Sequence, residues 1–251
     1  MDTASTIALS RLVAQSRAMD VTADNLANAT TPGYKTERLL FSDWLANAPA
    51  QADDGRTIPG GTTIAYTQDR ATWRDARDGA LTHTANPLDL AISGDGWFTV
   101  MTARGTRLTR AGRFNLSSTG AVVDAVGDGL LDTNGKPVQL SPADTRLTVA
   151  GDGTLSSENG PIAKIGVVRP VNAALMTAEG GDMMQASATT TVPVAQPKLV
   201  QGAVEDSNVS PVTETTTMMT ELREFEFTTQ FVQAESTREQ SAIDKILTPQ
   251  S

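Results

Sequence analysis

The stretch DNLANATTPGYK, residues 24–35, marks the end of a predicted amphipathic helix and the start of a turn. Pro32 cannot continue a helix and, with Gly33, favours a turn. Asn28 is well placed to end the helix in the left-handed conformation that asparagine tolerates. Capping does not account for Asn25, because it lies within the helix, where a polar residue on a packing seam costs stability while fixing register. We therefore predict that Asn25 specifies the geometry of a helix interface.

A helical pattern occurs near each end of the chain. Residues 5–26 and residues 211–248 both repeat less polar side chains in alternating steps of three and four. Asn208 and Pro211 mark the start of the second pattern and Pro249 its end. Isolated helices of this kind are marginal in water, so we expect the stripes to pack on each other or on neighbouring copies. The predicted seam is Leu9, Leu12, Ser16, Met19, Ala23, Leu26, Met218, Leu222, Phe225, Thr229, Val232, Ser236, Ile243 and Ile246.

Between the helices, short runs bounded by Gly, Asn, Asp or Pro predict antiparallel β structure. Asn134-Gly135 is the pair that a type I′ hairpin turn requires. The predicted strands are residues 97–100, 107–110, 120–123, 146–149 and 163–168. The sequence therefore predicts a segregated α+β chain. Its parts are a helical domain of residues 1–35 and 205–251 with coiled-coil-like pairing, an extended connector of residues 36–75, and a mainly antiparallel β domain of residues 76–204.

Composition excludes several classes of function. The chain has 251 residues and a formal net charge of −9, without a run of basic residues, which disfavours nucleic acid and anionic membrane surfaces as partners. It contains no cysteine, so neither disulfides nor thiolate metal sites can form. Because no run of about 18 apolar residues occurs, we expect no membrane insertion. The N-terminus also lacks the pattern of a cleaved Sec-type signal.

Catalytic and metal-binding patterns are weak. His83 is the only histidine, and its neighbours resemble neither a nucleophile elbow nor a zinc signature. Residues 132–135 begin like a calcium loop, but Ala143 stands where the bidentate glutamate belongs. The glycines of residues 94–96 predict a turn, because Trp97 continues as a strand and does not open a phosphate-binding helix. We therefore predict no enzymatic activity and no cofactor.

Three segments, in order along the chain, resemble signature sequences of the bacterial flagellar rod and hook proteins. Residues 24–35 resemble the Asn-Leu-Ala-Asn signature, and residues 202–212, with Asn208 and Val209, are similar to the Ser-Asn-Val segment that opens the C-terminal helix. The third segment resembles the Gly-Asp-Gly-aromatic-Phe motif of the β domain and consists of Gly94, Asp95, Gly96, Trp97 and Phe98.

Less specific features indicate which type of subunit within the family the chain resembles. Residues 68–72, residues 79–89 and the lack of a large insertion resemble the F-type subunits of the proximal rod more than the G-type subunits of the distal rod or the hook subunit. Residues 213–217 depart from the family, because they are rich in threonine where relatives usually carry more Glu, Val and Met.

The resemblance implies a structural subunit of the torque-transmitting rod, which assembles in the periplasm with other rod subunits and with copies of itself. It implies passage through the flagellar type III export apparatus without signal cleavage. The helices would form an inner axial layer and the β domain an outer one, with Asn25 and Asn28 hydrogen-bonding across the inner layer. The implied assembly interface is Leu12, Met19, Asn25, Leu26, Asn28, Met218, Leu222, Phe225, Val232 and Ile243.

Two alternatives remain open from the sequence. One is a G-type distal-rod subunit of the same family. The other is a secreted β-rich protein that binds or hydrolyses carbohydrate, in which Asp95, Asp128 or Asp152 would supply acidic groups at turn tips.

Overall fold

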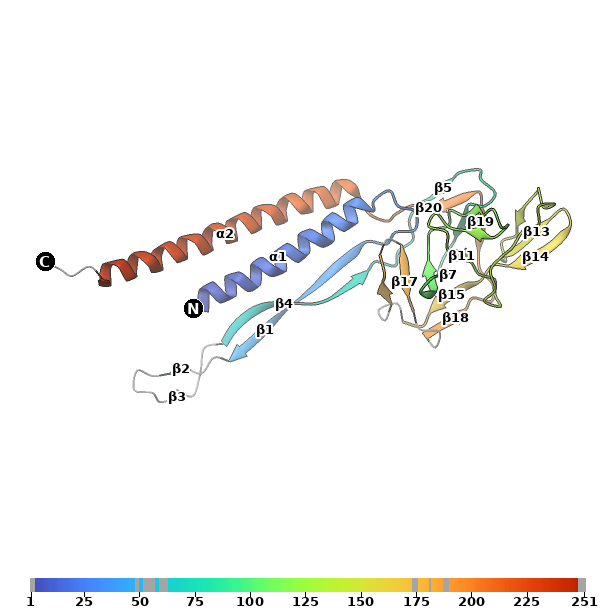
Figure 1. Ribbon diagram of the computed structural model, residues 1–251. Helices are drawn as coiled ribbons and strands as arrows, with labels where there is room; N and C mark the ends of the chain where they lie inside the picture. The colour runs from blue at the N-terminus through green and yellow to red at the C-terminus, as the bar shows by residue number, and fades with distance from the viewer. Residues whose placement is uncertain are drawn as a thin grey trace. The chain divides into compact units, whose positions relative to one another are not determined.

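The computed structural model describes residues 3–47, 50–51, 57–58, 63–172, 176–180, 182–186 and 190–247. The chain begins with helix α1 (Thr3–Ala27) and ends with helix α2 (Pro211–Leu247), and antiparallel β structure lies between them, so the fold is α+β as predicted (Figure 1). The strands are β1 (Glu37–Asn47), β2 (Ala50–Gln51), β3 (Thr57–Ile58), β4 (Thr63–Arg74), β5 (Leu81–His83), β6 (Leu90–Ile92), β7 (Trp97–Thr102), β8 (Gly105–Thr109), β9 (Asn115–Leu116), β10 (Val122–Val123), β11 (Gly129–Leu130), β12 (Thr148–Val149), β13 (Thr154–Ser157), β14 (Gly160–Lys164), β15 (Val167–Pro170), β16 (Thr177–Ala178), β17 (Met183–Gln185), β18 (Thr191–Pro193), β19 (Leu199–Gln201) and β20 (Ala203–Glu205).

The chain divides into two compact units. The helical unit contains residues 1–26, 37–73 and 211–251, and the β unit contains residues 27–36 and 74–210. This division differs from the predicted domains in three places. Strands β1 and β4 pair with each other and belong with the helices, where a separate connector was expected. Residues 27–36 and residues 205–210 belong to the β unit. The difference has a simple cause, because strand pairing between residues far apart in sequence leaves no local signal.

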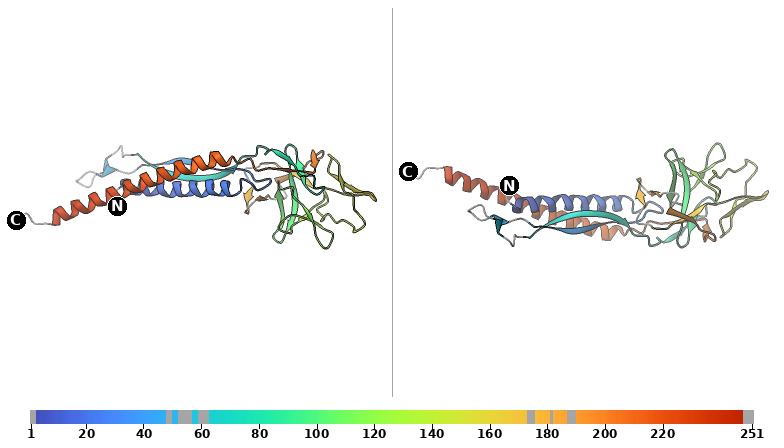
Figure 2. Two further views of the ribbon diagram at one scale, coloured as in Figure 1. Left: turned by 90° about the horizontal axis from the view of Figure 1, so that it is seen from above. Right: turned by 90° about the horizontal axis from the view of Figure 1, so that it is seen from below.

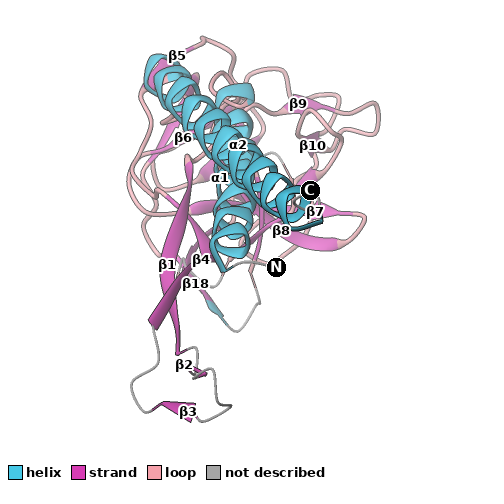
Figure 3. Cartoon of the chain, turned by 90° about the vertical axis from the view of Figure 1, so that its left-hand side faces the viewer, coloured by secondary structure: helices cyan, strands magenta, loops and turns pink. Residues whose placement is uncertain are grey.

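Within the helical unit, α1 and α2 lie side by side and run antiparallel, with β1 alongside them (Figures 2 and 3). Helix α2 begins with Pro211 in its first turn and carries Glu214 there, as helix starts favour. The threonine-rich run does not interrupt the helix. The hydroxyls of Thr215 and Thr216 donate to the carbonyls of Pro211 and Val212, one turn earlier.

The face of α1 that is buried in the helical unit is not the predicted seam. Leu9 is 59% exposed, and four of the five buried side chains lie one residue before a seam position, about 100° round the helix. Leu12, Met19 and Leu26 are half-buried at the border of this face. The buried side chains are small or polar, namely Ala8, Ala14, Gln15, Thr22 and Asn25.

Helix α2 shares part of its predicted seam with the buried face. Met218, Phe225 and Val232 are half-buried, whereas Leu222 is 48% exposed and Ile243 is 55% exposed. The fully buried side chains between them are Glu214, Thr228 and Glu235. The two helices therefore meet through small and polar groups, and large apolar side chains remain outside.

The β unit is built on a nine-stranded sheet in the order β16-β17-β8-β7-β11-β10-β9, with β15 paired to both β7 and β18. Smaller sheets join β12, β13 and β14, β19 with β6, and β20 with β5. Phe98 and Phe114 are 0% exposed and meet edge to face with ring centroids 5.5 Å apart. The surrounding core residues are Leu90, Ile92, Val100, Val122, Leu130, Val138, Leu140, Val149, Leu155, Ile165, Val167 and Leu199.

Most predicted strands are confirmed, since β7, β8, β10 and β12 fall within or across the expected runs. The run of residues 163–168 is instead divided between β14 and β15. At the break, a Cβ on Gly166 would lie 2.7 Å from the carbonyl oxygen of Asp132, so the backbone approaches another segment too closely for a side chain.

The predicted type I′ turn at Asn134-Gly135 is wrong. Only Gly135 has a positive φ there, 75°, and the backbone N–H of Asp132 donates to the carbonyl of Lys136. This is a three-residue hairpin connection ending in a left-handed glycine. Both oxygens of the Asp132 carboxylate accept hydrogen bonds from the loop. The backbone N–H groups of Asn134 and Lys136 each donate to its Oδ1 at 2.8 Å. The carboxylate therefore stabilises the longer loop.

Among the described residues, neither helix has a stretch apolar enough and long enough to cross a membrane.

Candidate functional site

Asn25 joins three elements of the helical unit. It is 1% exposed, its Nδ2 donates to the carbonyl of Glu37 at 2.8 Å, and the Glu37 N–H donates to its Oδ1 at 2.8 Å. The side-chain amide thus pairs with a backbone peptide as a neighbouring strand would, and fixes the start of β1 against α1. The Nδ2 also lies 3.4 Å from Oε2 of Glu214 in the first turn of α2.

Within the single chain, both amide groups of Asn25 bond to Glu37, so the residue fixes the register between α1 and β1. The hydrogen bond across subunits that the family resemblance implies stays a prediction. The polar residue within a helix was the signal for a geometric role. Nothing in the sequence identified Glu37 as its partner.

A polar cavity of about 180 Å³ adjoins Asn25 and is lined by α1, β1 and α2. Three of its lining residues are acidic, Glu37, Glu214 and Glu221, and the guanidinium of Arg38 lies 3.6 Å from Glu214. Burial raises the pKa of Glu221, a hydrogen bond from Thr22 opposes this shift, and the charge of Glu214 adds to it. The cavity therefore disfavours further negative charge.

Asn28 does not end α1 in the left-handed conformation, so that prediction is wrong. Among the described residues, Ala85 is the only residue other than glycine with a positive φ. The side chain of Asn28 instead accepts a hydrogen bond from the Thr31 hydroxyl at 3.2 Å. The predicted Pro-Gly turn is confirmed, with Gly33 at φ 74° and the Tyr34 N–H donating to the Thr31 carbonyl.

The residue that follows this turn enters a buried ionic cluster in the β unit. Lys35 Nζ lies 2.5 Å from Glu205 Oε1, and Arg110 Nη1 lies 3.0 Å from Glu205 Oε2. All three side chains are buried: Lys35 is 2% exposed, Arg110 is 4% exposed and Glu205 is 1% exposed. Gly79 N–H also donates to Glu205 at 2.9 Å, and Lys35 donates to the Arg77 carbonyl at 2.7 Å. The two cations share the carboxylate of Glu205, and the additional hydrogen bonds offset part of the cost of burying these charges.

Asn208 ties the same region together through its side-chain amide. Its Oδ1 accepts from the N–H and the hydroxyl of Thr36, at 2.8 and 2.7 Å. Its Nδ2 donates to the carbonyls of Asp75 and Arg77, each at 3.0 Å. We call Lys35, Thr36, Arg110, Glu205 and Asn208 the anchor cluster. It holds the three segments of the β unit that continue along the chain into the helical unit.

The Gly-Asp-Gly-Trp-Phe motif supports this cluster from inside the β unit. The carbonyl of Gly94, a residue with φ 98°, accepts a hydrogen bond from Arg110 Nη2 at 2.8 Å. The Arg110 guanidinium lies 5.7 Å from the centre of the Trp97 ring, a cation–π distance. Phe98 fills the core, and Asp95 is exposed at the turn. All three motif segments of the sequence therefore meet around Glu205 and Arg110.

The side chains considered for catalysis lie apart from any such cluster. His83 is exposed on β5, and Asp152 is exposed at a turn where the backbone N–H of Thr154 lowers the pKa of its carboxyl. In the parts of the chain that the structure describes, no three His, Cys, Asp or Glu side chains form a group that could hold a metal ion.

Comparison with known protein families agrees with the three motif segments. Residues 6–35 match the family described as "Flagella basal body rod protein". Residues 91–157 match "Flagellar hook protein FlgE/F/G D1 domain", and residues 200–245 match "Flagellar basal body rod FlgEFG protein C-terminal". Each of these regions contains or overlaps one of the motif segments.

Full-length relatives cover nearly the whole chain. A FlgF flagellar basal-body rod protein of Caulobacter vibrioides is 32% identical over 98% of both chains. A FlgF of Mesorhizobium japonicum is 30% identical over 94% of this chain and 95% of the relative. A FlgG of Bacillus subtilis is 30% identical over 83% of this chain and 85% of the relative.

The chain therefore belongs to the flagellar basal-body rod protein family. The two relatives that match over nearly the full chain are both named FlgF, which confirms the resemblance to F-type subunits. Membership of this family gives no support to the alternative interpretation as a secreted carbohydrate-binding or hydrolytic protein.

Proposed function

We propose that this chain is a structural subunit of the rod, in which the helical unit makes the contacts that build the axial drive shaft. One observation carries this proposal. The helices bury small and polar side chains against each other and leave large apolar side chains outside. These exposed apolar side chains are Leu9, Val13, Val212, Met219, Leu222, Phe227, Phe231 and Ile243, which are 48–77% exposed.

Exposed apolar side chains on a long helix favour burial against a partner. We propose that the predicted seam, centred on Leu12, Met19, Met218 and Leu222, packs against helices of neighbouring subunits in a coiled-coil-like layer. Half-burial of Leu12, Met19 and Met218 in the single chain supports this, because such residues lie at the rim of the internal contact and can extend it.

The β unit suits an outer, load-bearing role. Its core is complete without a partner, and the anchor cluster fixes the segments that lead to the helices. We propose that the subunit works without enzymatic activity or cofactor. Its relatives are named as rod proteins, which supports a structural role.

The partners that we propose are other rod subunits, copies of this chain, and the flagellar type III export apparatus, which would carry it to the periplasm without signal cleavage. The names of the family and of the relatives support a basal-body location. A distal-rod role is the second candidate, and the FlgG relative supports it.

A charge on the exposed seam tests the proposal. Leu222→Asp should leave the unfolding of the purified chain nearly unchanged, because Leu222 is 48% exposed. In a strain whose only copy carries the substitution, basal bodies should lack complete rods and swimming should be lost, because an unpaired charge is costly inside an interface. Val126→Asp, at a side chain 83% exposed in the β unit, is the matched control and should swim normally. Normal rods with Leu222→Asp would contradict the proposal.

A further inference from the structure

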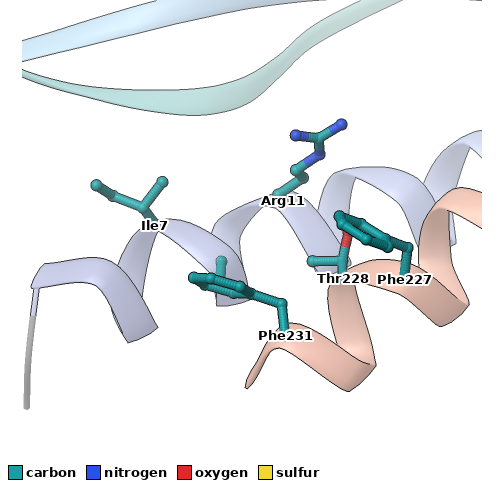
Figure 4. Close-up of a pocket in the computed structure, with 6 residues that line it drawn as sticks. Ile7, Arg11, Phe227, Thr228 and Phe231 are labelled. Atoms are coloured by element: carbon teal, nitrogen blue, oxygen red, sulfur yellow. The ribbon is translucent and has the colours of Figure 1, made fainter. Parts of the chain in front are cut away.

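A groove of about 400 Å³ lies within the helical unit between α1 and α2 (Figure 4). Its walls are Ile7, Ala8 and Arg11 from α1 and Phe227, Thr228 and Phe231 from α2. The Phe227 and Phe231 side chains are 73% and 48% exposed, so the groove is open and largely apolar. Arg11 supplies its single charge and makes no ion pair among the described residues.

The far end of α2 has the opposite character. Helix α2 has 37 residues and α1 has 25, and α2 continues beyond the start of α1 (Figure 1). The row that includes Phe225 and Val232 therefore continues to Glu239 and Ile243, which are both exposed, Ile243 by 55%. Glu239 and Ile243 lie on one face, one helical turn apart. This end of α2 thus presents one acidic and one apolar side chain together.

We propose that the groove of one copy of the chain receives the C-terminal end of α2 from a second copy, with Ile243 in the groove and Glu239 beside Arg11. This inference rests on the proposed function and names the partner of one part of its interface. Charge complementarity supports it, because Glu239 and Arg11 are opposite in sign. The spacing agrees as well. Ile7 and Arg11 are four residues apart on α1, as Glu239 and Ile243 are on α2, about 6 Å in each case.

The matched order fixes the direction of the incoming helix. Ile243 against Ile7 and Glu239 against Arg11 place it antiparallel to α1 and therefore parallel to α2 of the receiving copy. Groove and helix end are different surfaces, so the contact is heterologous and leaves a free groove and a free helix end on every pair. Repetition of such a contact extends a stack of subunits and does not close a dimer.

Cysteine cross-linking tests this contact directly, because the chain contains no cysteine. Two differently tagged full-length copies, one with Ile7→Cys and one with Ile243→Cys, are expressed together in a strain that lacks the native protein, and its basal bodies are oxidised. We expect a cross-linked product that carries both tags. Val212→Cys replaces Ile243→Cys in the control and should give none, because Val212 is 77% exposed in the first turn of α2, at the other end of the helix from Ile243.

Charge reversal then tests the polar half of the contact. In the copy with Ile7→Cys, Arg11→Glu should lower the cross-linked fraction about tenfold, because two like charges then meet. Glu239→Arg in the other copy should restore it. Motile cells whose basal bodies contain both copies without the mixed product would overturn this inference and leave the rod function intact. A cross-link from Ile7→Cys to a different rod protein would overturn it too. Absence of the chain from basal bodies would overturn the proposed function itself.

Discussion

The β unit and the helices bury opposite kinds of side chain. In the β unit, Phe98 and Phe114 are 0% exposed at the centre of a continuous apolar core. On the helices, the buried positions include Gln15, Thr22 and Glu214, while Phe227 is 73% exposed. Because the largest apolar groups are buried in one region and exposed in the other, burial of apolar surface within the chain stabilises the β unit more than the helices. We propose that the β unit is stable by itself and that neighbouring subunits complete the packing of the helices.

Truncation of a phenylalanine in each region should show the largest difference. Phe114→Ala should lower the free energy of unfolding of the β unit by about 3–5 kcal/mol, because it leaves a cavity beside Phe98. Phe227→Ala should change the stability of the isolated chain by less than about 0.5 kcal/mol, because its ring is mostly solvent-exposed. Urea unfolding of the purified full chain measures both. Equal losses for the two variants would contradict the comparison.

The anchor cluster should show the next largest effect. Glu205→Gln removes the charge shared by Lys35 and Arg110, both of which are buried, and should cost the β unit about 3 kcal/mol. Hydrogen exchange of the β7 and β8 amides at increasing urea concentration measures the loss.

The matched control for this change is Asp78→Asn. Asp78 lies 3.4 Å from the same guanidinium but is 47% exposed, so its loss should cost under about 1 kcal/mol. If both variants were equally stable, the buried cluster would have no special part in holding the β unit.

Asn25 tests the internal register of the helical unit. Asn25→Leu leaves the N–H and carbonyl of Glu37 without their partners and should cost about 1–3 kcal/mol of local stability. The Glu37 amide should then exchange faster while the β core is unaffected. Asn25→Asp should be at least as harmful, because a carboxylate cannot donate to the Glu37 carbonyl and lies near Glu214. Unchanged exchange at Glu37 would show that the amide pair is incidental.

The smallest effect concerns an exposed carboxylate of the β unit. The Thr145 hydroxyl, the Thr145 N–H and the Arg146 N–H donate to Glu158 and lower its pKa from 4.5 to about 2. A depressed pKa means that this carboxylate stabilises the fold above pH 4.5 and that the contribution is lost as the pH falls through about 2. Glu158→Gln should therefore reduce the loss of stability between these pH values. A pH profile identical to that of the unchanged chain would contradict this assignment.

The sequence predicted the elements better than their contacts. Glycine, asparagine and proline at turn positions located both helices and most strands, because local backbone geometry depends on local residues. The apolar stripe of α1 indicated a face that is half-buried or exposed in the single chain, since the internal contact uses Ala8 and Gln15. An apolar stripe predicts that a helix face is buried, but it does not show whether the face packs within the same chain or against another subunit.

The site was predictable as three motifs and not as a cluster. Lys35 and Glu205 are 170 residues apart, and neither has a local signal for burial. Asn208 was predicted to open a helix, whereas its amide holds Thr36 and the carbonyls of Asp75 and Arg77. Such contacts depend on the tertiary fold, which sequence periodicity does not encode.

Hydrogen exchange of the full chain, compared between the purified monomer and assembled basal bodies, tests the central claim most directly. In the monomer, amides of α1 and α2 should exchange much faster than those of β7 and β8, because isolated helices with a polar internal contact open readily. In the rod, the helical amides should become as protected as the β core, with little change in β7 and β8. Helices as protected as the β core in a verified monomer, or no gain in protection on assembly, would contradict the proposal that neighbouring subunits complete the helical unit.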